Sequence, residues 1–227
     1  MTTPPANSNA GHRARLRRRF LDRVPGALYD HEVLELLLTY AIPRRDVKSL
    51  AKALILRFGS FAGVLDASEY DLSNMDGIGE NAAALILLVK AAGALYLEQR
   101  LRREMLLDQA QACADFARMK LGSGGKETLL VIFMNRQYRM LDYCCIPGTV
   151  DHAAVFPREI LELCLRYHAT AVLLAHNHPS GVCTPSDEDI RLTQVIRDLL
   201  KGADISLIDH LLVTPYDWTS FKSLHLL

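Results

Sequence analysis

Residues 171–189 read AVLLAHNHPSGVCTPSDED, and this stretch decides the fold of the chain around it. Its first part, 171–175, is a short apolar run of the kind that forms a buried β-strand when Pro and Gly follow it. Side chains two positions apart on a strand point to the same face. His176 and His178 can therefore converge on one point, while Asn177 faces away.

After these histidines the chain turns and begins a helix. The letters PSG at 179–181 favour a tight turn. Thr184 followed by Pro185 predicts the helix start, because a hydroxyl residue is a preferred N-cap and proline is favoured at the first helical position. Ser186 and Asp189 lie three positions apart and so share a face of the first helical turns. The fold thus returns a hydroxyl and a carboxylate toward the two imidazoles.

This set of side chains suits a catalytic metal. Two imidazole nitrogens and one carboxylate oxygen, with the fourth position left to water, are the ligands of a catalytic zinc site. Bound zinc lowers the pKa of water from about 15.7 to about 7, which makes hydroxide available as a nucleophile at neutral pH. A general base is needed as well. If Asp189 is a ligand, that base must come from elsewhere in the chain.

Simpler interpretations stand beside this one. Histidines at a strand end can bond to backbone groups, and Ser186 and Asp189 by themselves are ordinary first-turn residues that complement the helix dipole. The joint pattern favours a metal. The letters HNH at 176–178 are no evidence for an HNH nuclease, whose residues are scattered over a hairpin and a helix. Cys183 has no partner cysteine nearby, and we interpret it as incidental.

The spacing of these residues resembles a known family. His176-x-His178, seven residues, and then Ser186-x-x-Asp189 resemble the signature of the JAMM metallopeptidases of the MPN fold. The patterns HNHPSG and TPSxxD, the second at 184–189, are similar to those of the bacterial RadC branch of that family. RadC-like proteins also carry a helical N-terminal segment with a GIG turn, found here at 77–79, so the resemblance covers most of the chain.

The resemblance implies roles for the matching residues. His176, His178 and Asp189 would be ligands of Zn²⁺, and Ser186 would support the oxyanion or the attacking water.

JAMM enzymes also use a glutamate on an early strand as the acid and base. The matching residue is Glu127, which opens the apolar segment ETLLVIFMN at 127–135. Glu159 and Glu162 on a later helix remain alternatives, because only the order of elements favours Glu127.

Apolar periodicity divides the chain in two. The pattern is helical up to about Arg103, and after the glycine-rich segment 122–126 it alternates between strands and helices, which predicts a mixed α/β domain. In this second part we expect helices at 109–120, 157–168 and 185–201 and strands at 127–135, 139–148, 171–175 and 205–214. The expected fold class is α/β (α+β), with a disordered tail at 1–11, a helical helix-hairpin-helix-like domain at 12–103 and an MPN/JAMM metal-binding domain at 104–227.

Composition limits the class of protein. The chain has 227 residues, and its 26 basic residues balance 26 acidic ones, so its overall charge predicts neither nucleic-acid nor membrane binding. The apolar stretches are interrupted before membrane-spanning length, and the first residues do not form a signal peptide. Five cysteines without a CxxC pair suit reduced thiols. We therefore expect a cytoplasmic protein.

Basic residues gather near the N-terminus in HRARLRRRF at 12–20. Beside a GIG turn, such a cluster could contact DNA phosphates, since backbone N–H groups at a helix start bind anions. A solvated helix face explains the same cluster and is favoured, because Asn81 stands where relatives often carry a basic residue. Similarly, Asp209 and His210 could orient a metal ligand, although a buried histidine with satisfied hydrogen bonds is the favoured interpretation.

The sequence therefore predicts a zinc-dependent hydrolase that cleaves peptide or isopeptide bonds with a metal-bound hydroxide and a Glu general base. The alternative is a DNA-binding or DNA-repair-associated protein whose metal is structural or vestigial.

Overall fold

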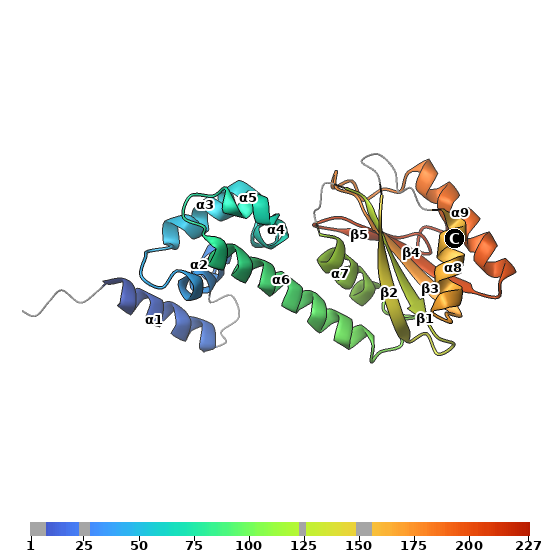
Figure 1. Cartoon of the computed structure of the whole chain (residues 1–227), viewed down its shortest axis with the longest axis horizontal. Helices are drawn as coiled ribbons and strands as arrows, with labels where there is room; N and C mark the ends of the chain where they lie inside the picture. The colour runs from blue at the N-terminus through green and yellow to red at the C-terminus, as the bar shows by residue number, and fades with distance from the viewer. Residues whose placement is uncertain (1–7, 23–27, 123–125, 149–155) are drawn as a thin grey trace, which may run out of the picture. The chain divides into compact units, whose positions relative to one another are not determined.

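The computed structural model shows two compact units, Met1–Ala91 and Ala92–Leu227 (Figure 1). The structure describes residues 8–22, 28–122, 126–148 and 156–227. The division between the units falls within one long helix, α6 (Glu80–Leu101).

The first unit is helical. Its helices are α1 (Ser8–Leu21), α2 (Asp30–Ala41), α3 (Lys48–Phe58), α4 (Phe61–Asp66), α5 (Glu69–Ser73) and the start of α6 (Glu80–Leu101). Leucines four positions apart put one face of α2 and one face of α3 into a common core, namely Leu34 and Leu38 on α2 and Leu50 and Leu54 on α3.

Side-chain caps separate the short helices. The Ser60 hydroxyl accepts the backbone N–H of Gly63 at the start of α4, and the Ser68 hydroxyl accepts that of Asp71 at the start of α5. The GIG turn then leads into α6. Gly77, the first residue of this turn, has φ +94°, a backbone conformation that glycine adopts without strain.

Helix α1 begins at Ser8. The sequence suggested disorder through residue 11, so the structure differs there; residues 1–7 of the expected tail lie outside the described residues. Leu16, which is 1% exposed, attaches α1 to the first unit. His12 Nε2 also lies 2.8 Å from Oε1 of the buried Glu35 on α2.

The second unit is built around a five-stranded mixed sheet in the order β2-β1-β3-β4-β5. The strands are β1 (Thr128–Met134), β2 (Met140–Pro147), β3 (Ala171–Asn177), β4 (Ser206–Val213) and β5 (Trp218–Ser220). β3 and β4 are parallel, whereas the other neighbouring pairs are antiparallel. The α+β class expected from the sequence is confirmed.

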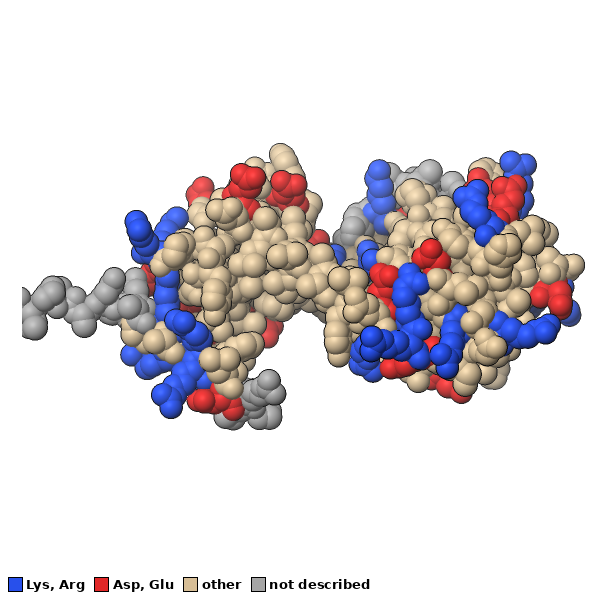
Figure 2. Space-filling model, turned by 60° about the horizontal axis from the view of Figure 1, so that its bottom comes forward, with Lys and Arg blue, Asp and Glu red and all other residues tan. Residues whose placement is uncertain are grey.

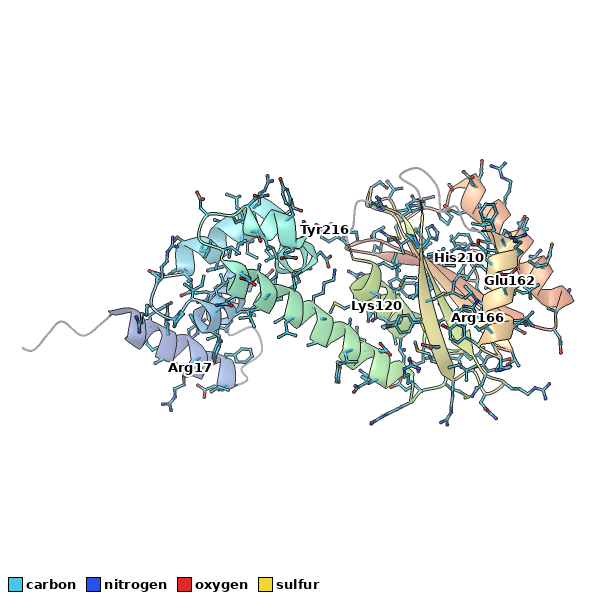
Figure 3. The ribbon with its side chains drawn as sticks, viewed as in Figure 1. Arg17, Lys120, Glu162, Arg166, His210 and Tyr216 are labelled. Atoms are coloured by element: carbon cyan, nitrogen blue, oxygen red, sulfur yellow. The ribbon has the colours of Figure 1, made fainter. Side chains whose placement is uncertain are left out.

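Helices cover both faces of this sheet. α7 (Ala110–Leu121) packs on one face, and α8 (Pro157–Arg166) and α9 (Asp187–Gly202) pack on the other (Figure 1). In Figure 3, Lys120 marks α7 and Glu162 marks α8. Alternate residues of β1 enter the two layers: Leu130 packs against the α7 side and Val131 against the α8 and α9 side.

Strand β3 is central and its seven residues are all buried. It pairs with β1 on one side and with β4 on the other, so its carboxyl end is held by two neighbours. The parallel pairing of β3 with β4 requires a crossover connection, which α9 supplies. As a result, the end of β3 and the start of α9 lie at the same edge of the sheet, where open α/β sheets place their ligands.

Some details of the second unit differ from the sequence predictions. β3 continues to Asn177, beyond the apolar run, because His176 pairs with both neighbours and Asn177 pairs with β4. The short strand β5 was not predicted. Its three residues carry no periodic pattern, and their pairing with β4 defines the strand.

Helix α6 is, by length and composition, the one helix among the described residues that could cross a membrane. Its apolar run is nevertheless interrupted by Lys90, as expected from the sequence. The same composition also occurs in core helices of soluble proteins. Ala82, Ala83 and Ile86 of α6 lie in the core of the first unit.

Candidate metal centre

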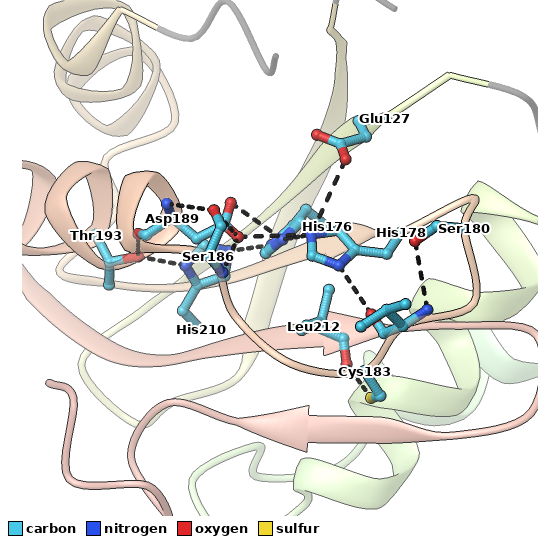
Figure 4. Close-up of polar contacts among 11 residues, drawn as sticks. Glu127, His176, His178, Ser180, Cys183, Ser186, Asp189, Thr193, His210 and Leu212 are labelled. Carbon is cyan, nitrogen blue, oxygen red and sulfur yellow. Dashed lines mark hydrogen bonds and ion pairs between the residues drawn. The ribbon is translucent and has the colours of Figure 1, made fainter. Parts of the chain in front are cut away.

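Three potential ligands meet at the edge of the sheet (Figure 4). His176 is the penultimate residue of β3, His178 follows the strand, and Asp189 lies in the first turn of α9. The Nε2 atoms of the two histidines are 3.2 Å apart. Asp189 Oδ1 lies 3.4 Å from His176 Nε2, and Asp189 Oδ2 lies 3.5 Å from His178 Nε2.

The turn after β3 holds His178 in place. Its backbone N–H donates to Val213 O at 3.0 Å, which extends the pairing with β4 by one residue. Gly181 then donates its N–H to His178 O at 3.0 Å, and its φ of +78° reverses the chain at little steric cost. His178 Nδ1 lies 2.9 Å from Val182 O. A carbonyl oxygen only accepts, so Nδ1 of His178 carries the proton and the Nε2 lone pair faces the cluster.

The N-cap of α9 is Ser186, not Thr184 as the sequence suggested. The Ser186 hydroxyl accepts the Asp189 N–H at 3.1 Å, and Asp189 Oδ2 accepts the Ser186 N–H at 2.8 Å. This reciprocal capping box satisfies two backbone donors and therefore prevails over the Thr184-Pro185 start. The Ser186 hydroxyl donates its own proton to Asp189 Oδ2 at 2.6 Å.

The electrostatics of the cluster favour a cation. Burial opposes ionisation of the Asp189 carboxyl, but contacts with His176 and His178 outweigh burial and hold its pKa well below the usual range. The Asp189 contact raises the pKa of His178 above its ordinary value. Two imidazole lone pairs directed at one point need a proton or a metal between them. A divalent ion fits this donor set, because it can bind all three atoms at once.

Glu127 approaches the same cluster from β1. It directly precedes the strand, and its Oε1 lies 4.0 Å from His178 Nε2. The other two acids considered from the sequence, Glu159 and Glu162, lie on α8. Within the described part of the chain, neither forms an ion pair with the three candidate ligands. The geometry therefore favours Glu127 over both alternatives.

Asn177 holds the backbone on both sides of Glu127. Its amide oxygen accepts the Thr128 N–H at 2.8 Å, and its amide nitrogen donates to Lys126 O at 3.2 Å. Asn177 is 2% exposed and faces away from the histidines, as the strand alternation predicts. Its function was not apparent from the sequence, because its partners lie about fifty positions earlier.

Asp209 and His210 have separate partners. His210 is 2% exposed, and its Nε2 lies 2.8 Å from His176 Nδ1. His210 is therefore a buried histidine that also contacts a candidate ligand. Burial, together with the neighbouring His176, lowers the pKa of His210 well below its ordinary value. Asp209 points instead to the C-terminal segment, where it accepts the Ser220 hydroxyl at 2.6 Å and the Lys222 N–H at 3.0 Å.

Cys183 remains outside the ligand set, as expected; its thiol lies 3.8 Å from Leu212 O. All five cysteines are free thiols.

The N-terminal arginines are only partly available for a partner. Arg13 donates to backbone carbonyl oxygens of Ile42, Pro43 and Arg45, and Arg19 pairs with Glu32 at 2.8 Å. Both therefore help to attach α1 to the rest of the first unit. The other members, Arg15, Arg17 and Arg18, are exposed. Figure 2 shows Lys and Arg side chains gathered at one end of this unit.

A protein-family model described as a RadC-like JAB domain matches residues 107–226. The match covers more than half of the chain and includes the three candidate ligands and Glu127. The helical first unit is compatible with the same family. The chain therefore belongs to the RadC family, and its second unit is a RadC-like JAB domain.

Proposed function

We propose that this protein is a zinc-dependent hydrolase that acts on peptide or isopeptide bonds. One observation carries the proposal: an independent carboxylate, Glu127, lies beside the cluster formed by His176, His178 and Asp189. Metal hydrolysis needs both a ligand set and a general base. A JAB domain is compatible with such a hydrolase.

Zinc is the metal that this donor set favours. Two imidazole nitrogens and one carboxylate oxygen match the three-ligand sets of catalytic zinc sites, whereas structural sites use four protein ligands. Among the described residues, the group that could hold an ion contains three side chains, which leaves a position for water or substrate. When bound, zinc lowers the pKa of water and polarises a carbonyl oxygen.

Residues of this chain would then supply the proton transfer and the positioning that the reaction needs. Glu127 accepts a proton from the attacking water and returns it to the leaving nitrogen, so the carboxylate is regenerated. Asn177 keeps Glu127 in place through the backbone of Lys126 and Thr128. Ser186 orients Asp189 by donating its hydroxyl proton to Oδ2, and it would support the oxyanion or the water by turning that proton away from Asp189.

A comparison of wild type with Glu127→Gln tests the proposal. Both proteins are incubated with a peptide library, with and without a zinc chelator, and cleavage is followed by mass spectrometry. Wild type should cleave library members in a chelator-sensitive manner. Glu127→Gln should bind zinc like wild type but lose about 100- to 10,000-fold in rate, as expected for removal of a general base. Equal cleavage rates for both proteins would contradict the assignment of Glu127.

The free thiols also suit a reducing compartment, and we infer a cytoplasmic location.

A second candidate function is binding of DNA phosphates by the first unit, with the metal structural or vestigial. The Arg45 guanidinium lies 3.2 Å from where a Cβ on Gly77 would stand, so a cation is present at the GIG turn although Asn81 is not basic. Helix N-termini and arginines both favour phosphate oxygens. Neutralising Arg17, Arg18 and Arg45 together should reduce DNA affinity and its salt dependence. Affinity that does not change with salt would refute this candidate.

A further inference from the structure

A buried row of three side chains leads from α9 to His176 of the candidate metal centre (Figure 4). Thr193 Oγ1 on α9 is 2.6 Å from His210 Nδ1 on β4, and His210 Nε2 is 2.8 Å from His176 Nδ1 on β3. The three residues are 0%, 2% and 3% exposed, respectively. Buried polar groups of this kind require defined donors and acceptors.

The direction of each hydrogen bond follows from the first member of the row. The Thr193 hydroxyl is also 2.6 Å from the backbone carbonyl oxygen of Asp189. That oxygen only accepts, so Thr193 must donate its single proton there. The hydroxyl therefore accepts from His210, and Nδ1 of His210 carries a proton.

The same logic extends to the candidate ligand. A fully buried imidazole without an acidic partner is neutral and has one N–H group. Because His210 has its proton on Nδ1, its Nε2 is an acceptor. His176 must then donate from its own Nδ1, which leaves the Nε2 lone pair directed at His178 and Asp189.

We propose that the Thr193 hydroxyl, acting through His210, fixes the tautomer of His176 so that Nε2 is free to bind a metal. Thr193 and His210 are thus positioning residues: their hydrogen bonds reach the cluster at the Asp189 backbone oxygen and at His176 Nδ1, and not at the side-chain atoms that would bind a metal. This inference rests on the proposed function only in taking zinc as the ion that His176 binds. Hydrogen bonds that fix ligand tautomers in this way strengthen metal sites.

The surrounding structure keeps the row in register. Thr193 lies one helical turn after Asp189, so the helix that supplies a ligand also supplies the start of the row. The Phe221 ring, which is fully buried, stacks on His210 with ring centroids 4.5 Å apart. This stacking restricts rotation of His210 and preserves the roles of its two nitrogens.

Two substitutions at Thr193 separate its hydroxyl from its shape. Thr193→Val keeps the shape but removes the hydroxyl, whereas Thr193→Ser keeps the hydroxyl. The tautomer of His176 is read from imidazole ¹⁵N shifts of metal-free protein at alkaline pH. Wild type and Thr193→Ser should show the Nδ1–H form. In Thr193→Val, His210 should turn donor toward His176, and the His176 proton should move to Nε2.

Zinc affinity provides the second readout of these variants. Thr193→Val should bind zinc about 10- to 100-fold more weakly than wild type, and Thr193→Ser should stay close to it. An unchanged His176 tautomer in Thr193→Val would overturn the proposal, as would equal losses of affinity in both variants.

A pair of substitutions at His210 tests the same idea if Thr193→Val does not fold. The amide oxygen of His210→Gln can take the place of Nε2 and accept from His176, whereas the shorter His210→Asn reaches only the Nδ1 position. Zinc affinity should be preserved better by Gln than by Asn, and equal affinities would overturn the proposal. The tautomer of His176 is measured without metal, so this measurement tests the role of Thr193 even if wild type binds no zinc. Failure of wild type to bind zinc would refute the proposed function and leave the inference about the tautomer standing.

Discussion

Removal of the Asp209 carboxylate should detach the C-terminal segment from the sheet. Asp209 is 5% exposed and accepts two long-range hydrogen bonds, from the Ser220 hydroxyl at 2.6 Å and the Lys222 N–H at 3.0 Å. Hydrogen bonds to a charged acceptor contribute about 1.5–3 kcal/mol each. Two such bonds give about 3–6 kcal/mol, and solvation of the released Lys222 N–H offsets part of this. We expect Asp209→Ala to lower the free energy of unfolding by about 3–5 kcal/mol.

A double-mutant cycle with Ser220→Ala isolates the side-chain bond. Ser220→Ala should cost about 1.5–3 kcal/mol in wild type but much less in the Asp209→Ala background, where the carboxylate is absent. Urea unfolding of the four proteins supplies the energies. Asp198→Ala is the matched control, because within the described residues this exposed acid forms an ion pair with Arg197 alone, and its loss should change stability by less than about 0.5 kcal/mol.

The same double-mutant cycle can also refute the role of the Asp209–Ser220 bond. Additive effects, with a coupling energy below about 0.5 kcal/mol, would show that the Asp209–Ser220 bond does not fasten the segment. Asp209→Ala should also weaken zinc binding, because Phe221 lies between Ser220 and Lys222 and packs on His210.

Three further outcomes are expected at the metal centre. Asn177→Ala should lower the hydrolytic rate by about 10- to 100-fold, through displacement of Glu127, without changing zinc affinity; a parallel loss of zinc would contradict this. Apparent zinc affinity, measured by chelator competition, should fall as pH decreases through the raised pKa of His178, because a protonated imidazole cannot bind metal; affinity independent of pH would exclude His178 as a ligand. In metal-free protein, the raised pKa of His178 makes the protonated imidazole stabilise the fold. This stabilisation is complete below the ordinary pKa of 6.5 and disappears as the pH rises through the pKa of the folded state. The urea midpoints of wild type and His178→Gln should therefore converge at alkaline pH.

The sequence predicted those features that depend on neighbouring residues. Short apolar runs identified β1 and β3, and the spacing of His176, His178 and Asp189 predicted the cluster that the structure brings together. Strand period and helical turn determine such local geometry. Glu127 needed the resemblance to a family as well, because no nearby residue marks it.

Features that depend on distant partners could not be predicted. Thr193 looks like any polar residue on an exposed helix until β4 brings His210 to 2.6 Å from it. Asn177 gains its role only when β1 pairs with β3. The N-cap of α9 was misplaced for a related reason: Thr184-Pro185 and Ser186 are both good local starts, and only the folded capping box shows that Ser186 prevails.

Metal content measured on purified protein tests the central claim most directly. Wild type, Asp189→Ala and Asp187→Ala are compared by mass spectrometry for zinc; Asp187 is a matched control because it is an exposed acid in the same helical turn. We expect stoichiometric zinc in wild type and in Asp187→Ala and almost none in Asp189→Ala. Zinc-free wild type, or full occupancy in Asp189→Ala, would contradict the account.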